Sequence, residues 1–202
     1  MIIIGLTGPS GSGKTQLCSV AKKLGCETIN ADEVYHSLLI PPSECLDEIV
    51  WNFGDVLLPN GHLDRPRLGN IVFSDSEKLL LLNSITHKYV KQKFRDIILR
   101  MKLAGAKSVI VDAPTLFESG FDKECDVTVS LLASESLRRQ RIISRDTLDS
   151  KRADARLASQ KNDDFFISRS DHVIYNNGSK SELEKKLADL LLRINKESGN
   201  NE

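Results

Sequence analysis

The sequence opens with MIIIGLTGPSGSGKT, residues 1–15, which is the most informative segment of the chain. Its first part is an apolar run, and residues 8–15 fit the phosphate-loop pattern G-x-x-x-x-G-K-[ST] at every fixed position. A strand that leads into a glycine-rich turn and then a helix gathers backbone N–H groups and the positive end of a helix dipole around one anionic pocket. A plain Gly/Ser-rich turn is the alternative, but the preceding strand and the Lys-Thr pair favour polyphosphate binding.

The side chains of this loop also suit a polyphosphate. Its glycines let the backbone curl close to a ligand, where a Cβ atom would obstruct the approach. Lys14 supplies a mobile cation for the β- and γ-phosphates, and the Thr15 hydroxyl supplies an oxygen ligand for Mg²⁺. The predicted nucleotide contacts within this stretch are Gly11, Ser12, Gly13, Lys14, Thr15 and Gln16.

Composition favours one cytosolic globular domain. The chain has 202 residues, 40% of them apolar and 28% charged, which is enough to bury a substantial core. Lys+Arg 28 balances Asp+Glu 28, so the charge indicates neither nucleic acid nor an anionic membrane as a partner. The cysteines are scattered, which favours buried thiols over a zinc site or disulfides. Because no apolar run approaches about 20 residues, we expect a cytoplasmic protein.

Short β-branched runs alternate with helical patterns, which is typical of a parallel sheet wrapped by helices. Strands are expected at residues 2–6, 28–30, 107–112, 126–132 and 172–175. Helices are expected up to about residue 24, after residue 31, over about 75–103, in pieces over 135–161, and over about 181–194 before a frayed tail. The fold class is therefore α/β, with a parallel β-sheet core flanked by helices.

The middle of the chain is expected to be helical and packed. Residues 41–67 are rich in Pro and Gly, which predicts short helices joined by turns, and Trp51 is among the apolar residues expected to pack there. Residues 74–77, Ser-Asp-Ser-Glu, match the capping box that opens a helix, with Ser74 as its first residue. Gly105 is the expected stop for that helix.

The ends of the predicted strands carry the candidate chemistry. In open α/β sheets, ligands gather where strands end, and Lys14, Asp32 and Asp112 follow such strands. Phosphoryl transfer needs a cradled donor, neutralised charge and an acceptor oxygen held in line. A carboxylate at Asp32 can orient a hydroxyl acceptor and receive its proton as general base. Because Asp32 precedes a helix it can also be an N-cap, and both roles can coexist.

Arginines form a second cluster of candidate residues, with four of them within residues 138–145. At helical spacing Arg138, Arg141 and Arg145 share a face, so they could close over a triphosphate as a mobile lid. The alternative is a solvated basic face paired with nearby aspartates, namely Asp146, Asp149 and Asp154. Composition alone favours the solvated face.

The order of these motifs along nearly the whole chain resembles the dephospho-CoA kinase family. The motifs are residues 5–15, Ala31-Asp32, residues 63–65, residues 85–87, the DAPTLFE stretch at 112–118, Arg141, Arg145, Ser159-Gln160, and residues 171–174 with the Asn-Asn-Gly turn at 176–178. A phosphate loop is shared by many unrelated activities. The combination of the Pro-x-Leu-Phe-Glu stretch with the late Ser-Gln and the Asn-Asn-Gly turn is narrow.

The resemblance implies ATP-dependent phosphorylation of the ribose 3′-hydroxyl of dephospho-CoA, giving CoA and ADP, the last step of coenzyme A biosynthesis. Mg²⁺ is the expected cofactor. It also implies one three-layer P-loop kinase domain over residues 1–202. Its expected parts are a core (1–40, 106–137 and 166–202), a helical acceptor-binding part (about 41–105) and an Arg-rich lid (about 138–165).

The resemblance also implies roles for single residues. Asp32 becomes the carboxylate that activates the acceptor, and Arg65 and His87 lie in the acceptor site. The predicted catalytic residues are Lys14, Asp32 and Arg141. The predicted further contacts to ATP are Arg145, meeting phosphates, and Asn176 and Gly178, bordering the adenine. Asp112 either joins the Mg²⁺ shell through water or serves as a structural turn carboxylate.

Three positions depart from the usual family pattern. Asn30 replaces an aspartate, which removes a negative charge, and His36 replaces an arginine, which exchanges a permanent cation for a mostly neutral ring. Both changes could weaken the affinity for the acceptor. Lys88 replaces a proline, and it either returns positive charge to the acceptor side or is an ordinary lysine on a helix surface.

The sequence leaves two rival functions open. One is another small-molecule kinase, of the nucleoside monophosphate or shikimate type, because these share the core and the lid. The other is a catalytically impaired nucleotide-binding regulator, suggested by Asn30 and His36. The presence of Lys14, Thr15 and Asp32 counts against the regulator. A role on DNA or RNA is disfavoured by the balanced charge.

Overall fold

The computed structural model describes residues 1–199 and divides into two compact units. One unit consists of Met1–Ile29 with Gly105–Glu202, and the other is Asn30–Ala104. Among the helices of the described residues, none is both long enough and apolar enough to cross a membrane.

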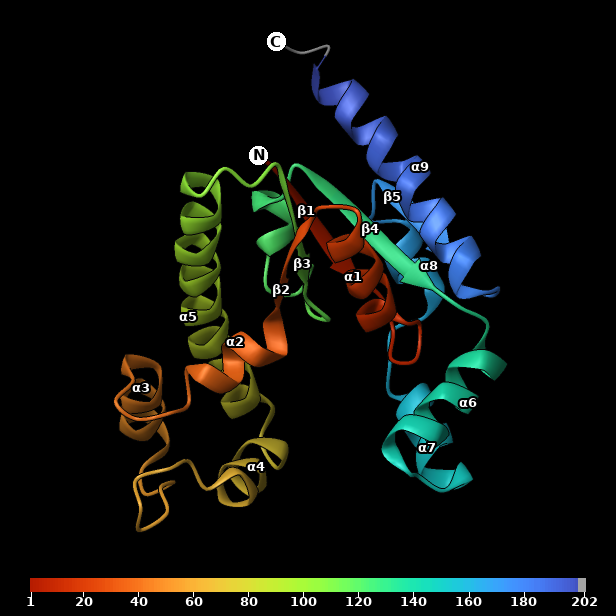
Figure 1. The fold of residues 1–202 in the computed structure, drawn as a ribbon. Helices are drawn as coiled ribbons and strands as arrows, with labels where there is room; N and C mark the ends of the chain where they lie inside the picture. The colour runs from red at the N-terminus through yellow and green to blue at the C-terminus, as the bar shows by residue number, and fades with distance from the viewer. Residues whose placement is uncertain (200–202) are drawn as a thin grey trace. The chain divides into compact units, whose positions relative to one another are not determined.

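The first unit is built on a five-stranded sheet in the order β2-β3-β1-β4-β5 (Figure 1). The strands are β1 (Ile2–Thr7), β2 (Glu27–Asn30), β3 (Ser108–Asp112), β4 (Val127–Leu132) and β5 (His172–Tyr175). β1 pairs in parallel with both β3 and β4, and β4 pairs in parallel with β5. These strands are mostly apolar and buried because helices flank the sheet. The predicted α/β fold is confirmed.

Helices complete this unit. They are α1 (Lys14–Lys23), α6 (Glu135–Asp146), α7 (Ser150–Ala158), α8 (Asp163–Ile167), α9 (Lys180–Gly199) and a 3₁₀ turn η1 (Phe121–Glu124). α1 packs on α9, and the core between them and the sheet contains Leu17 and Val20 of α1 with Leu183 and Leu187 of α9. α9 is longer than predicted. The tail expected to fray after Lys196 is helical as far as Gly199, and residues 200–202 lie outside the described residues.

The second unit is helical. It contains α2 (Ala31–Ser37), α3 (Glu44–Phe53), α4 (Arg65–Phe73) and α5 (Ser76–Leu103), and α5 packs against the other three. Its own core includes Ile49 of α3, Leu68 of α4 and Ile85 of α5. The prediction that Trp51 packs into this core is wrong, because its side chain is 88% exposed. Trp51 lies two residues from Ile49, and positions two apart on a helix face different directions.

The helix caps correct two expectations. Asp75, and not Ser74, caps α5: its carboxylate accepts hydrogen bonds from the N–H groups of Glu77 and Lys78. The Ser74 hydroxyl belongs to the preceding helix, where it donates to carbonyl oxygens at the end of α4. Asn30 caps α2 by accepting from the Glu33 N–H at 3.1 Å, so the alternative of Asp32 as N-cap is wrong.

Candidate active site

The phosphate loop joins β1 to α1, and its path requires glycine. Gly8 has a φ of 137°, and a Cβ atom there would lie 2.2 Å from the backbone oxygen of Leu131 in β4. Gly13, which precedes α1, has a φ of 100°, and its Cβ would lie 2.4 Å from the side-chain nitrogen of Asn176. These close approaches fix the loop against the ends of β4 and β5.

Lys14 is the first residue of α1, and its side chain folds back over the loop. Its ammonium group donates to the backbone oxygen of Gly8 at 2.7 Å and of Pro9 at 3.4 Å. Thr15 follows with an exposed side chain, and Gln16 is half-buried beside it. The structure therefore holds a cation and an exposed hydroxyl-bearing residue at the positive end of a helix, which suits a polyphosphate.

Asp112 ends β3 at the same edge of the sheet. It lies in register with Leu6 of β1 and is only 6% exposed. The Ala113 N–H donates to the Leu6 oxygen at 2.9 Å, and the Thr7 hydroxyl donates to the Pro114 oxygen at 3.2 Å, so this edge is firmly joined to the start of the loop.

The pKa of the Cys18 thiol in α1 depends on the charges near that helix. Burial is the main reason that the pKa of Cys18 rises to about 12, and the negative charge of Asp112 raises this pKa further. The positive charge of Lys14 acts on the same thiol in the opposite direction. The Asp112 carboxylate and the Lys14 ammonium group are thus both close enough to influence one side chain.

The donor groups at this edge fit Mg²⁺. The Thr15 hydroxyl and the Asp112 carboxylate supply oxygen, which is what this ion prefers, and it usually completes its shell with phosphates and water. Within residues 1–199, no group of three or more His, Cys, Asp and Glu residues could hold a metal by itself. The arrangement therefore suits an ion that arrives with a nucleotide, and not a site made of protein ligands alone.

Arg141 of α6 is bonded directly to the phosphate loop. Its guanidinium donates to the backbone oxygens of Gly11 at 3.1 Å and Ser12 at 3.2 Å, and to that of Asn176 at 3.0 Å. Arg138 is also turned inward and is 9% exposed. A Cβ on Gly11 would lie 2.6 Å from the Arg138 oxygen, so α6 packs closely on the loop.

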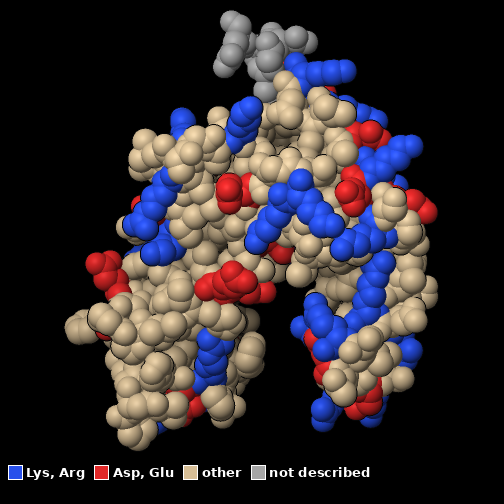
Figure 2. All heavy atoms as spheres, viewed as in Figure 1, with Lys and Arg blue, Asp and Glu red and all other residues tan. Residues whose placement is uncertain are grey.

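The remaining arginines pair with aspartates on α6 and α7. Arg145 forms two bonds to Asp146, at 2.7 and 2.9 Å, and Arg139 forms two bonds to Asp154, at 2.5 and 3.1 Å. The bond from Arg145 lowers the pKa of the Asp146 carboxyl below its usual range. Positive and negative side chains are accordingly mixed over this part of the surface (Figure 2). The aspartate pairing expected for these arginines is therefore present for Arg139 and Arg145, while closure of Arg138, Arg141 and Arg145 over a triphosphate stays a prediction.

The turn at residues 176–178 and Gln160 complete the surroundings of the loop. The Asn176 side chain is 3% exposed and donates to the Ser12 oxygen at 2.8 Å. Gln160, just beyond α7, accepts a 2.7 Å hydrogen bond from the Ser10 N–H in the loop. The sequence reasoning did not assign Gln160 a contact with the loop, because nothing in its spacing indicates a partner 150 residues away.

The three predicted acceptor residues, Asp32, Arg65 and His87, all belong to the unit Asn30–Ala104. Asp32 lies exposed in the first turn of α2, and His87 is half-buried on α5. Arg65 begins α4, and its guanidinium lies 2.6 Å from the Nδ1 atom of His36 on α2. An arginine can only donate, so this contact makes Nδ1 the acceptor and places the proton of a neutral ring on Nε2. The Arg65 guanidinium thus lies beside His36, but Arg65 is itself one of the motif residues, so it does not restore the cation that His36 replaces.

Lys88 is an exposed lysine on the surface of α5. It forms an ion pair with Glu48 of α3, and the Tyr89 hydroxyl donates to the same carboxylate at 2.7 Å. Hydrogen bonds from Lys88 and then from Tyr89 lower the pKa of the Glu48 carboxyl. Lys88 thus links α5 to α3.

A parallel sheet with a phosphate loop after β1 and arginines packed on that loop defines the P-loop kinase class. Shikimate kinase from Acinetobacter baumannii has the same fold, with a TM-score of 0.53 at 17% identity over 96% of this chain and 94% of its own. A family model described as dephospho-CoA kinase matches residues 2–182. The chain belongs to the dephospho-CoA kinase family.

Individual relatives agree with this family. The dephospho-CoA kinase of Syntrophotalea carbinolica is 35% identical, with 96% of this chain and 92% of the relative covered. The dephospho-CoA kinase of Arabidopsis thaliana is 36% identical, with 96% and 84% covered. Among solved structures, dephospho-CoA kinase from Campylobacter jejuni has a TM-score of 0.69 at 26% identity, over 97% of this chain and 98% of its own.

Proposed function

We propose that this protein transfers the γ-phosphoryl group of ATP to the ribose 3′-hydroxyl of dephospho-CoA, giving CoA and ADP, with Mg²⁺ as its cofactor. The observation that carries the proposal is the family match over residues 2–182, because it covers the phosphate loop, Asp32 and Arg141 together. Bound with the nucleotide, Mg²⁺ would neutralise phosphate charge, and Thr15 and, through water, Asp112 would hold it.

On the donor side, the phosphate loop and α6 would bind the triphosphate. The Lys14 ammonium group already lies over the loop, where it would exchange its bonds to backbone oxygens for bonds to phosphate oxygens. The three backbone bonds of Arg141 use only part of its donor capacity, so the same guanidinium can also contact phosphates. Arg145 would have to leave Asp146 to do so. Asn176 and Gly178 would border the adenine.

On the acceptor side, Asp32 would bind and deprotonate the ribose hydroxyl. Its exposed position in the first turn of α2 leaves the carboxylate accessible to a substrate. Arg65, oriented by His36, would supply positive charge for the diphosphate of dephospho-CoA, and His87 would complete the acceptor site.

Acceptor specificity tests this function. The protein is incubated with Mg·ATP and, in separate reactions, dephospho-CoA, AMP, CMP or shikimate, while ADP release is followed in a coupled assay. We expect acceptor-dependent ADP release with dephospho-CoA alone, and a product heavier by one phosphoryl group in the mass spectrum. Preference for another acceptor would support a rival kinase, and nucleotide binding without acceptor-dependent ADP release would support a regulator.

Replacing Arg141 with Lys tests whether the arginine holds the loop. A lysine keeps the charge but cannot reach three backbone oxygens with a planar fork, so we expect kcat/KM for ATP to fall by about 10- to 100-fold. Steady-state kinetics with varied ATP measure this. The matched control is Arg139→Lys on the same helix, where the guanidinium forms an exposed ion pair with Asp154, and we expect a change of less than about threefold. Equal effects of both substitutions would contradict the role of Arg141.

A further inference from the structure

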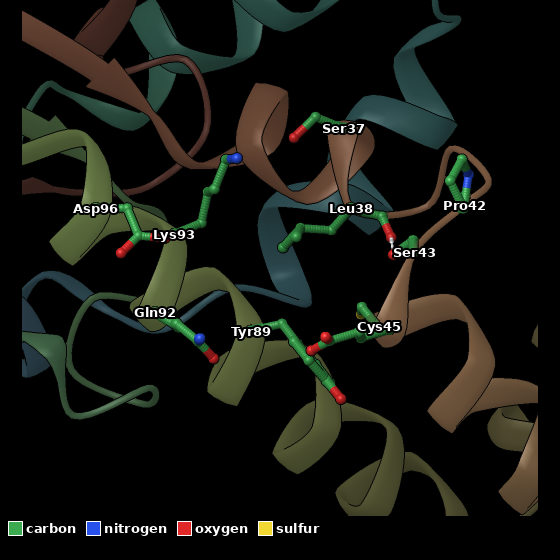
Figure 3. A pocket seen from close by; sticks show the side chains of 10 residues that line it. Ser37, Leu38, Pro42, Ser43, Cys45, Tyr89, Gln92, Lys93 and Asp96 are labelled. Carbon is green, nitrogen blue, oxygen red and sulfur yellow. Dashed lines mark hydrogen bonds between the residues drawn. The ribbon is translucent and has the colours of Figure 1, made fainter.

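The unit Asn30–Ala104 contains a cavity that none of the roles above uses. Its volume is about 330 Å³, at the lower end of the range of about 300–1,000 Å³ typical of small-molecule sites. It lies where the end of α2 and the start of α3 meet α5 (Figure 3). The residues that define it for the present purpose are Ser37, Leu38, Tyr89, Gln92, Lys93 and Asp96.

The lining suits a ligand with both apolar and hydrogen-bonding parts. Leu38 extends from the end of α2 into the space in front of α5, and Gln92 presents an amide from α5 (Figure 3). The lining contains one cation, Lys93, and two carboxylates, Glu44 and Asp96, so it has no excess of positive charge. Such a lining lacks the excess positive charge that phosphates require, so it fits an uncharged chain of methylene and amide groups.

Cys45, which also lines the cavity, does not add a charge. Burial raises the pKa of its thiol to about 11, and the neighbouring Glu48 contributes in the same direction. The thiol is therefore protonated at neutral pH, consistent with an uncharged ligand.

Three features follow one another along α2. The Asp32 carboxylate lies in its first turn, and His36, four residues later on the same face, contacts the Arg65 guanidinium. Ser37, the last residue of α2, lines the cavity. At about 1.5 Å per residue, Asp32 and Ser37 are separated by roughly 8 Å along the helix axis. The order is therefore a carboxylate, then a cation, then a cavity.

Dephospho-CoA carries matching groups in the same order: the ribose 3′-hydroxyl, the 5′-diphosphate, and the uncharged pantetheine arm with its two amides. Given the function proposed above, we propose that this cavity binds the pantetheine arm. The cavity then determines the preference for dephospho-CoA over other adenosine diphosphates, because a ligand without the arm leaves it unfilled.

Gln92→Trp tests this inference. Gln92 is exposed on α5, so a larger ring there obstructs the cavity without disturbing the core. The acceptors compared are dephospho-CoA and the β-methyl ester of ADP, which keeps the ribose hydroxyl and the diphosphate diester but has no arm. We expect KM for dephospho-CoA to rise at least about tenfold, with kcat/KM for the ester changing less than about threefold.

Leu99→Trp is the matched control, because Leu99 lies two turns further along α5, is 57% exposed and does not line the cavity. We expect this substitution to leave the kinetic constants for both acceptors unchanged. If circular dichroism shows that Gln92→Trp does not fold, Gln92→Leu takes its place. This variant removes the amide at similar size, and we expect it to raise KM for dephospho-CoA but not for the ester.

The outcomes separate the two proposals. If the unaltered protein does not phosphorylate dephospho-CoA, the proposed function fails. If it does, but treats the two acceptors alike, or if the Gln92 variants leave its preference unchanged, only the pantetheine site is overturned.

Discussion

Asp32→Asn is expected to lower kcat by about 10²-fold or more while ATP binds as before. The substitution keeps the size and hydrogen-bonding shape of the side chain but removes the group that would accept the proton of the ribose hydroxyl. The affinity for ATP should survive because Asp32 belongs to the unit Asn30–Ala104, whereas the phosphate loop belongs to the other unit. Steady-state kinetics with dephospho-CoA give kcat, and calorimetric titration with ATP gives the dissociation constant.

Glu33→Gln provides the matched control for this experiment. Glu33 is the other acidic residue in the first turn of α2, it is also exposed, and its charge interacts in the same way with the helix dipole. Both substitutions should therefore have similar small effects on stability, while only Asp32→Asn abolishes most of the turnover. An unchanged kcat in Asp32→Asn, or an equal loss in Glu33→Gln, would remove Asp32 from its role as general base.

The fold was predictable because its signals are local. Buried parallel strands appear as short apolar runs, and Gly8 and Gly13 in the phosphate loop mark positions where a side chain would collide with neighbouring strands or turns. The exposed Trp51 shows the limit of this reasoning. Its size and apolarity suggested burial, but the face on which a residue lies depends on the exact start of the helix, which the sequence gives less well.

Helix caps were located only approximately for a related reason. Ser74 and Asp75 are adjacent residues that both favour the N-cap position, and only the backbone geometry decides between them. The same limit applies to α2, where Asp32 is a candidate N-cap and Asn30 occupies that position. This outcome matters for function, because Asn30 makes the capping hydrogen bond and the Asp32 carboxylate is not needed as the N-cap.

Partners far apart in the sequence were the least predictable part of the site. Helical spacing placed Arg138, Arg141 and Arg145 on one face but could not say that Arg141 bonds to the loop while Arg145 bonds to Asp146. The bond between Gln160 and Ser10 and the contact between Arg65 and His36 likewise depend on how the chain folds back. Residue types and spacing therefore indicated candidates, and the tertiary structure decided their partners.

Lys14→Ala is expected to reduce kcat/KM for ATP by about 10²- to 10³-fold, with the fold retained. The ammonium group lies over the phosphate loop, and without it the charge that develops on the transferring phosphoryl group would lose a compensating cation. The fold should tolerate the change because Lys14 lies at the beginning of α1 and the core contacts of that helix come from Leu17, Val20 and Ala21. Steady-state kinetics and thermal unfolding measure the two effects separately.

Lys22→Ala separates the specific role of Lys14 from a general loss of positive charge. Lys22 is an exposed residue of the same helix, and its charge, like that of Lys14, lowers the pKa of the Cys18 thiol. Both substitutions should therefore slow alkylation of Cys18 at alkaline pH, because each leaves its thiolate less stabilised. Only Lys14→Ala should also impair turnover. If Lys22→Ala lowered kcat/KM as much, the contribution of Lys14 would be a diffuse electrostatic one and not a contact with the phosphates.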